Sequence, residues 1–283
     1  MEGLVQGLLT ALILALIAMH LGSSWRRWQV EEWARSMRLE LTPRNRTFVR
    51  SYIRRTRILR TGCGVAGLLT PVIYMAFVGE PIPQPFDFGL LNGLVGYLVG
   101  AVVAELLLKR PKAMVPTAAL VPRDLRDYLP SALTITLRAT AAAGLMLLLI
   151  YLSVPERVSR SPEILPPWMV MVSMILLILV GIELLQRYIV GRPQSAVEGD
   201  LVQADDAVRS ASLHALAGAG IALELIIVGA EIAAVGTIID IQLLRWVLPW
   251  IGLACGLVAL GSWMHVSRPD HWQVRRTHHG ATA

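Results

Sequence analysis

Two glutamates lie deep in an apolar stretch of the chain, where an ionisable side chain is expensive to keep. Glu224 falls near the middle of the apolar run 213–235, and Glu231 follows seven residues later. On a helix this spacing places both carboxyl groups on one face, about 10 Å apart along the axis. A carboxylate at mid-membrane depth is costly unless it is paired, protonated or in contact with water. The pattern indicates a site that binds a proton or a cationic substrate, or else protonated or ion-paired residues that only pack.

Two further charged residues are candidate partners of these carboxyl groups. Arg138 lies about seven residues inside its apolar run, and we expect its long side chain to reach the inner headgroups. A salt bridge to Glu183, or to the first of the deep glutamates, is the alternative. Glu183 precedes Arg187 by four residues, as Glu105 precedes Lys109, which is the favourable order for an ion pair near the end of a helix. We expect such helix-end pairing, and a matching pair of binding carboxylates is the alternative.

Long apolar runs must position these residues. With 55% hydrophobic and only 16% charged residues, the chain of 283 residues is too apolar for an ordinary soluble domain. Runs of about 20 apolar residues let an α-helix cross a hydrocarbon core, and these runs lack the alternation of a membrane β-barrel. They cover residues 4–22, 61–79, 88–108, 131–153, 168–190, 213–235 and 247–265. We therefore predict an all-α fold, a polytopic transmembrane bundle of about seven helices.

The basic residues predict how the helices are oriented. Eleven arginines and no lysine occur in 23–60, and the connectors 109–130 and 191–212 are also basic. By the positive-inside rule these segments are cytoplasmic, which places the N-terminus outside and the C-terminus inside. We divide the chain into a first transmembrane helix (1–22), a basic amphipathic interface segment (23–60), a six-helix bundle (61–265) and a cytoplasmic tail (266–283).

The segment 23–60 is predicted to contact lipid. Trp25 and Trp28 stand among charges at its start, as indoles at headgroup depth do. Apolar side chains then share one side of a helical wheel, at Phe48, Val49, Tyr52, Ile53 and Leu59. Basic side chains share the opposite side, at Arg50, Arg54 and Arg57. We expect this helix to lie on the anionic inner leaflet, and a docking surface for a cytosolic partner is the alternative.

A charged connector recurs between the apolar runs. Residues 120–124 (Leu-Val-Pro-Arg-Asp) are similar to 41–45 (Leu-Thr-Pro-Arg-Asn), and 201–205 form a weaker copy. Arg60 and Arg138 follow the first two copies at nearly equal spacing. We predict three parallel-repeat helical hairpins, made of the first and second, third and fourth, and fifth and sixth runs, plus a final helix. Small residues crowd the second, fourth and sixth runs, which predicts close packing inside the bundle or at a subunit interface.

Familiar catalytic and metal-binding motifs are absent from the sequence. It contains no Gly-rich phosphate loop, no His-Glu-x-x-His and no Gly-x-Ser-x-Gly. Cys63 and Cys255 lie in apolar runs near opposite ends of the chain and fit no zinc spacing. We expect no metal site and no cofactor, and we leave enzymatic activity open while favouring its absence. The net charge of +6 is accounted for by the basic inner side and by anionic lipid, so we expect no nucleic-acid partner.

Two segments carry a resemblance to known proteins. Residues 120–130 (Leu-Val-Pro-Arg-Asp-Leu-Arg-Asp-Tyr-Leu-Pro) and 209–218 (Arg-Ser-Ala-Ser-Leu-His-Ala-Leu-Ala-Gly) resemble a group of uncharacterised multi-pass membrane proteins of high-GC Gram-positive (actinobacterial) bacteria. The resemblance covers about the middle half of the chain. It implies a bacterial plasma membrane and a gene located near genes of exporter components, and it assigns no catalytic residue.

Two function classes fit these patterns. The first is a non-enzymatic membrane subunit or accessory of a larger assembly, such as a transport system with a separate ATPase chain. Its expected partners are the lipid bilayer, other membrane or cytosolic subunits, or a second copy of the chain. The alternative is a self-contained proton-coupled transporter, with Glu224 as the coupling carboxylate and Arg138 as its counter-charge. A carrier needs a water-filled pocket that reaches Glu224, whereas a subunit of an assembly would bury Glu224 against its neighbours.

Overall fold

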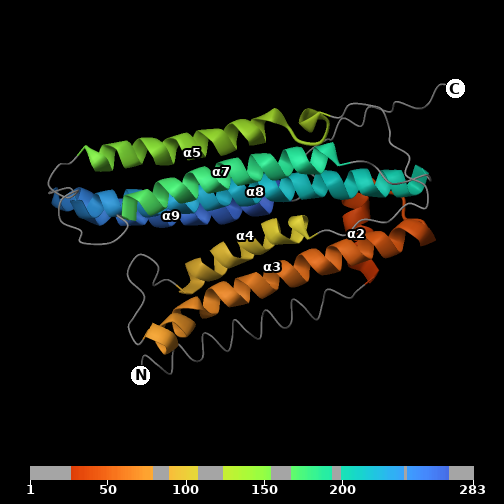
Figure 1. Cartoon of the computed structure of the whole chain (residues 1–283), viewed down its shortest axis with the longest axis horizontal. Coiled ribbons are helices and arrows are strands. Elements are labelled where there is room, and N and C mark those ends of the chain that lie inside the picture. The colour runs from red at the N-terminus through yellow and green to blue at the C-terminus, as the bar shows by residue number, and fades with distance from the viewer. Residues whose placement is uncertain are drawn as a thin grey trace. The chain divides into compact units, whose positions relative to one another are not determined.

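Helices make up the structure, a computed structural model that describes residues 27–78, 89–107, 124–153, 167–192, 199–238 and 241–267. No strand occurs in these ranges. The elements are α2 (Arg27–Ser36), α3 (Pro43–Val78), α4 (Gly89–Leu106), the 3₁₀ turn η1 (Leu125–Asp127), α5 (Ser131–Leu152), α7 (Pro167–Gly191), α8 (Gly199–Ile238) and α9 (Gln242–Val266). Figure 1 labels all of them except η1. The predicted all-α fold is confirmed.

Four of these helices are long and apolar enough to cross a membrane. The spans are Ser131–Ile150, Met169–Gly191, Asp200–Val235 and Gln242–Val266. A shorter apolar helix covers Asn92–Leu106, and the predicted run 4–22 lies outside the described residues. Four such helices indicate a membrane protein. The count of seven spans stays a prediction.

The chain divides into two compact units, and the first contains α2, α3, α4 and the start of α8. Glycines bring α3 and α4 into backbone contact there. A Cβ atom added at Gly67 would clash with the carbonyl of Asn92, and one added at Gly96 would clash with the carbonyl of Cys63. Small residues allow helices in a membrane to approach this closely. The close packing predicted for the second apolar run is therefore present between α3 and α4.

The first copy of the charged connector forms the start of α3. Thr42 precedes the helix, and its hydroxyl accepts a hydrogen bond from the Asn45 N–H at 3.2 Å. The Asn45 side-chain oxygen accepts one from the Thr42 N–H at 2.9 Å. This reciprocal capping box satisfies backbone donors that the first helical turn leaves without partners. Pro43, at the first helical position, has no N–H to satisfy and favours the helical backbone angle.

The amphipathic stretch of 23–60 forms the first half of α3, and three of the five residues on its apolar side are covered by the chain itself. Val49, Tyr52 and Ile53 are at most 8% exposed, and the ring of Tyr52 lies 5.9 Å from the ring of Trp33. The helix and its two sides were predicted correctly, but lipid is not what covers these three apolar residues. Trp25 and the side chain of Trp28 lie outside the described residues.

In the second unit, α8 is the central helix. The buried share of its membrane span is 67%, against 28% for α5, 17% for α7 and 11% for α9. A Cβ atom at Gly220 would meet side chains of α5 and α7, and one at Gly218 would meet side chains of α9. Farther along, Gly229 and Gly252 bring the backbones of α8 and α9 into contact. Groups on α8 are thus shielded from lipid by the helices around it.

Candidate functional site

Glu224 and Glu231 are buried on α8. Glu224 is 0% exposed and Glu231 is 4% exposed. Within the described part of the chain, none of the four carboxyl oxygens has a hydrogen-bond partner. Most buried polar groups in proteins do have one, so two adjacent exceptions call for an explanation.

The face of α8 that carries these glutamates packs against α5 and α7. Gly220, Glu224 and Glu231 follow one another at helical spacings and share this face. A Cβ atom added at Gly144 on α5 would lie 3.4 Å from Oε2 of Glu231. The other side-chain atoms nearest to a Cβ at Gly144 or Gly220 are apolar and belong to Leu137, Ile175, Ile182 and Val228. Both carboxyl groups are therefore held in an apolar interior.

This arrangement suits a neutral carboxylic acid. Burying an unpaired negative charge in an apolar interior costs much free energy, whereas burying a protonated carboxyl group costs far less. Each carboxyl group can hold one proton for as long as the helices stay packed. Release of the proton requires that water or another base reaches the oxygen atoms.

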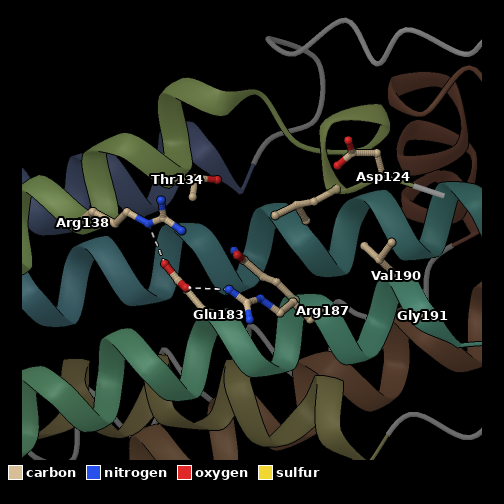
Figure 2. A pocket seen from close by; sticks show the side chains of 9 residues that line it. Asp124, Thr134, Arg138, Glu183, Arg187, Val190 and Gly191 are labelled. Atoms are coloured by element: carbon tan, nitrogen blue, oxygen red, sulfur yellow. Dashed lines mark hydrogen bonds and ion pairs between the residues drawn. The ribbon is translucent and has the colours of Figure 1, made fainter.

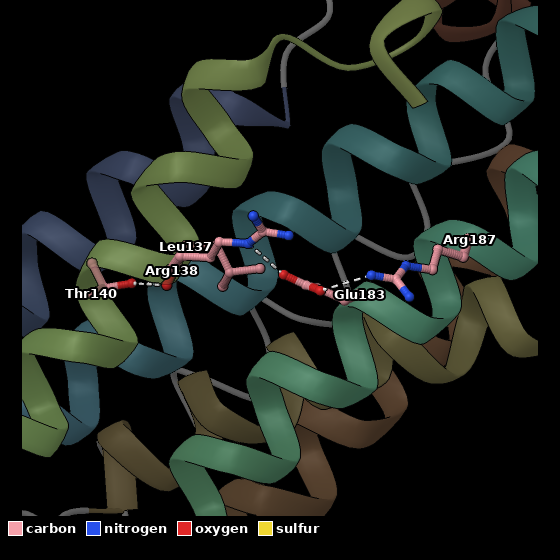
Figure 3. Close-up of polar contacts among 5 residues, drawn as sticks. All are labelled: Leu137, Arg138, Thr140, Glu183 and Arg187. Atoms are coloured by element: carbon pink, nitrogen blue, oxygen red, sulfur yellow. Dashed lines mark hydrogen bonds and ion pairs between the residues drawn. The ribbon is translucent and has the colours of Figure 1, made fainter. Parts of the chain in front are cut away.

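Arg138 on α5 pairs with Glu183 on α7 and not with Glu224. Nε of Arg138 lies 2.7 Å from Oε1 of Glu183, and Nη2 of Arg187 lies 3.5 Å from Oε2 of the same carboxylate. Figure 2 and Figure 3 show the Glu183 carboxylate between the two guanidinium groups. The helix-end pair of Glu183 with Arg187 was predicted and is present. Arg138 forms the alternative salt bridge with Glu183, while its side chain stays 57% exposed.

A cavity of about 750 Å³ opens beside this ion pair. Polar side chains that line it include Asp124, Thr134, Arg138, Glu183, Gln186 and Arg187 (Figure 2). Gln186 is only 1% exposed, and neither its amide nitrogen nor its amide oxygen has a hydrogen-bond partner among the described residues. Glu224 and Glu231 do not line the cavity. The charged residues predicted as one site thus fall into two places, an apolar interior and a polar cavity.

The first unit contains an ion pair of the same composition. Nη2 of Arg60 on α3 lies 3.6 Å from Oε1 of Glu105 on α4, and the Tyr52 hydroxyl donates to that oxygen at 3.2 Å. The Glu105 side chain is 0% exposed, against 21% for Glu183. The second-unit pair opens onto a cavity, whereas Glu105 in the first unit is sealed.

Sequence reasoning missed the pairing of Glu105 with Arg60. It paired Glu105 with Lys109 instead, a residue outside the described ranges. A signal was present, because Arg138 follows Arg60 by 78 residues and Glu183 follows Glu105 by the same 78 residues. Gln186 was also missed. Nothing in its sequence neighbourhood distinguishes it, and only its burial does.

The basic residues proposed to contact lipid lie on α3. Arg50 and Arg54 are exposed, and Arg57 is partly buried, which lowers the pKa of its guanidinium group. Over the described ranges, no group of three or more His, Cys, Asp or Glu side chains is placed to hold a metal ion.

Comparison of the chain with protein-family models, with curated proteins and with solved structures finds no match.

Proposed function

We propose that this membrane protein binds and releases protons at Glu224 and Glu231 during a transport cycle. The observation that carries the proposal is the burial of both carboxyl groups without a hydrogen-bond partner in the described residues. Intramembrane carboxyl groups are costly, and proton relays in transporters are a use that requires them. A purely structural position is served as well or better by an apolar side chain of similar size.

The conformation described here is closed at this site. The cavity beside Arg138 does not include Glu224 or Glu231, and the oxygen atoms of both carboxyl groups are buried by the described residues. Proton exchange requires a second conformation, in which α5 or α7 moves away from α8 and admits water. A carrier that moves one group of helices against another passes through such a sealed state.

Carbodiimide labelling tests both requirements. Dicyclohexylcarbodiimide is membrane-soluble and adds to a protonated carboxyl group. We expect peptide mass spectrometry of protein labelled in membranes at neutral pH to find adducts at Glu224 and Glu231. Glu32, which is exposed to solvent, is the internal control. Glu224→Gln and Glu231→Gln should each remove one adduct. If neither glutamate is labelled, the site does not open with a proton bound, and the proposal fails.

The burial of Glu224 by the chain itself favours a second candidate function. A non-enzymatic subunit of a larger membrane assembly, such as a transport system with a separate ATPase chain, would keep Glu224 permanently packed. Mild purification from the native membrane, followed by identification of co-purifying chains, separates the two candidates. A stoichiometric nucleotide-binding partner together with unlabelled Glu224 supports the subunit. A protein that purifies alone with labelled Glu224 supports the self-contained transporter.

We also propose the bacterial plasma membrane as the location, with the basic connectors on the cytoplasmic side. The proposal is supported by the arginine-rich segment 23–60 and by the basic connectors between the helices.

A further inference from the structure

The cavity between the ends of α5 and α7 is lined by two arginines, Arg138 and Arg187, and by two acids, Glu183 and Asp124. Both arginines share the single carboxylate of Glu183. Each guanidinium has five N–H donors, so most of them are not used by Glu183. The other acid of the lining, Asp124, accepts a hydrogen bond from the backbone of Arg126 at 3.3 Å and caps η1. The cavity thus offers more donors than the chain satisfies.

Gln186 gives the cavity a second, independent feature. Its side chain lines the cavity, is 99% buried, and has no hydrogen-bond partner for either end of its amide among the described residues. An amide kept dry without a partner is unfavourable, because it loses the hydrogen bonds that it makes in water. A ligand in the cavity that accepts from the amide N–H group would remove this penalty.

The matching ion pair in the first unit shows that the charged residues alone do not make a cavity. Glu105 there is held by Arg60 and by the Tyr52 hydroxyl, and its side chain is inaccessible. Where Glu105 has Tyr52 as its second partner, Glu183 has Arg187, and the Glu183 carboxylate stays accessible. Only this second pair is arranged to receive a further group.

We propose that the cavity binds a phosphate group through Arg138, Arg187 and Gln186. Guanidinium groups bind phosphate oxygens in pairs and hold them strongly. The cavity volume of about 750 Å³ exceeds the size of a bare phosphate, which leaves room for the alcohol of a phosphate ester. Basic pockets between membrane helices near the headgroups bind anionic lipid heads in this way. The phosphate comes from an anionic phospholipid or from a soluble ester, and the proposal does not depend on proton binding at Glu224.

Binding is measured on the full-length protein with two probes. Native mass spectrometry of protein in detergent counts bound phosphatidylglycerol against phosphatidylcholine, and calorimetric titration measures binding of glycerol phosphate. The test variants are Arg138→Gln and Gln186→Leu. The matched control is Arg126→Gln, because Arg126 is exposed in the same connector but does not line the cavity. Gln186→Leu breaks no protein hydrogen bond in the described residues, so it is expected to fold.

We expect at least one probe to bind the parent and the Arg126→Gln variant equally. Arg138→Gln should weaken binding at least about tenfold, and Gln186→Leu about threefold or more. Retention of phosphatidylglycerol alone assigns the site to lipid, and binding of glycerol phosphate assigns it to a soluble ester. Absence of binding with both probes overturns the proposal. So does binding that Arg126→Gln weakens as much as Arg138→Gln, because the charge of the connector would then be sufficient.

Discussion

The carboxyl group of Glu224 lowers the stability of the apolar interior, and we propose that it is kept for proton binding. Its carboxyl group is fully buried without a partner in the described residues, which costs about 1–3 kcal/mol relative to a satisfied group. Leucine has a similar volume and no polar atoms. We therefore expect Glu224→Leu to raise the free energy of unfolding by about 1–2 kcal/mol while it removes proton binding. Denaturant unfolding in detergent, followed by tryptophan fluorescence, measures the change.

The matched control is Glu105→Leu, which removes a carboxyl group of equal burial that does have partners. Arg60 and Tyr52 would lose their shared acceptor, so this variant should lose stability. If Glu224→Leu also loses stability, then Glu224 makes a structural interaction and the proton-binding role is contradicted.

The two ion pairs should respond differently to loss of their arginine. Arg60→Gln removes the arginine from the sealed carboxylate of Glu105, and the loss of a charged partner from a buried ion pair lowers the free energy of unfolding by about 3 kcal/mol. Arg138→Gln leaves Glu183 with Arg187 and with access to solvent, so we expect a much smaller loss. Thermal unfolding of both variants in one detergent compares them. Equal losses would show that the difference in burial has no energetic effect.

Among single residues, sequence reasoning found those that local spacing determines. The pair of Glu183 with Arg187 depends only on a four-residue step within one helix, and it was predicted. The pair of Arg60 with Glu105 joins two helices, and Tyr52, which donates to Glu105, lies 53 residues from it in sequence. Such contacts depend on how helices cross, which the sequence alone does not specify. Gln186 was missed for the same reason.

At the scale of elements, glycines determine how closely α3 approaches α4. Gly67→Ala would place a methyl group against the backbone of Asn92, so the helices must separate. We expect a loss of about 1–3 kcal/mol in the free energy of unfolding. Gly62→Ala lies on the same helix with nothing within 4 Å, and it should gain up to about 1 kcal/mol from helix propensity. Thermal unfolding of the two variants is the measurement, and a neutral Gly67→Ala would contradict the close backbone contact.

Helix limits were predicted less well than apolar runs. The apolar run 61–79 was treated as an element separate from the amphipathic segment, yet α3 continues from Pro43 to Val78. In the same way, α8 begins at Gly199, ahead of its apolar run at 213. A change from polar to apolar residues marks the depth at which lipid begins, whereas caps and breakers set where a helix ends. The capping box at Thr42 is the signal that places the start of α3.

At the scale of the whole chain, helix packing bears on one of the predicted hairpins: α8 packs on α7, as expected for the fifth and sixth runs, and further contacts join other runs. The sequence suggested pairs made of the third and fourth runs and of the fifth and sixth runs. In the described residues α3 packs on α4, and α5 packs on α7, which joins the second run to the third and the fourth to the fifth. The internal repeat stays a prediction. Arg60 and Arg138 are separated by 78 residues, and so are Glu105 and Glu183, which is the spacing that such a repeat would give.

Orientation in the membrane is a property of the whole chain, and cysteine labelling tests it. Three helices that can span a membrane, α5, α7 and α8, separate Arg126 from Gln242, so the two positions belong on opposite sides. The orientation proposed above, with the basic connectors on the cytoplasmic side, puts Arg126 inside. With Cys63 and Cys255 replaced by alanine, an impermeant maleimide on intact cells should label Gln242→Cys. Arg126→Cys should react only after the membrane is opened, and the cysteine-free parent reports background. The reverse pattern would invert the proposed orientation, and labelling of both positions from outside would contradict a three-helix separation.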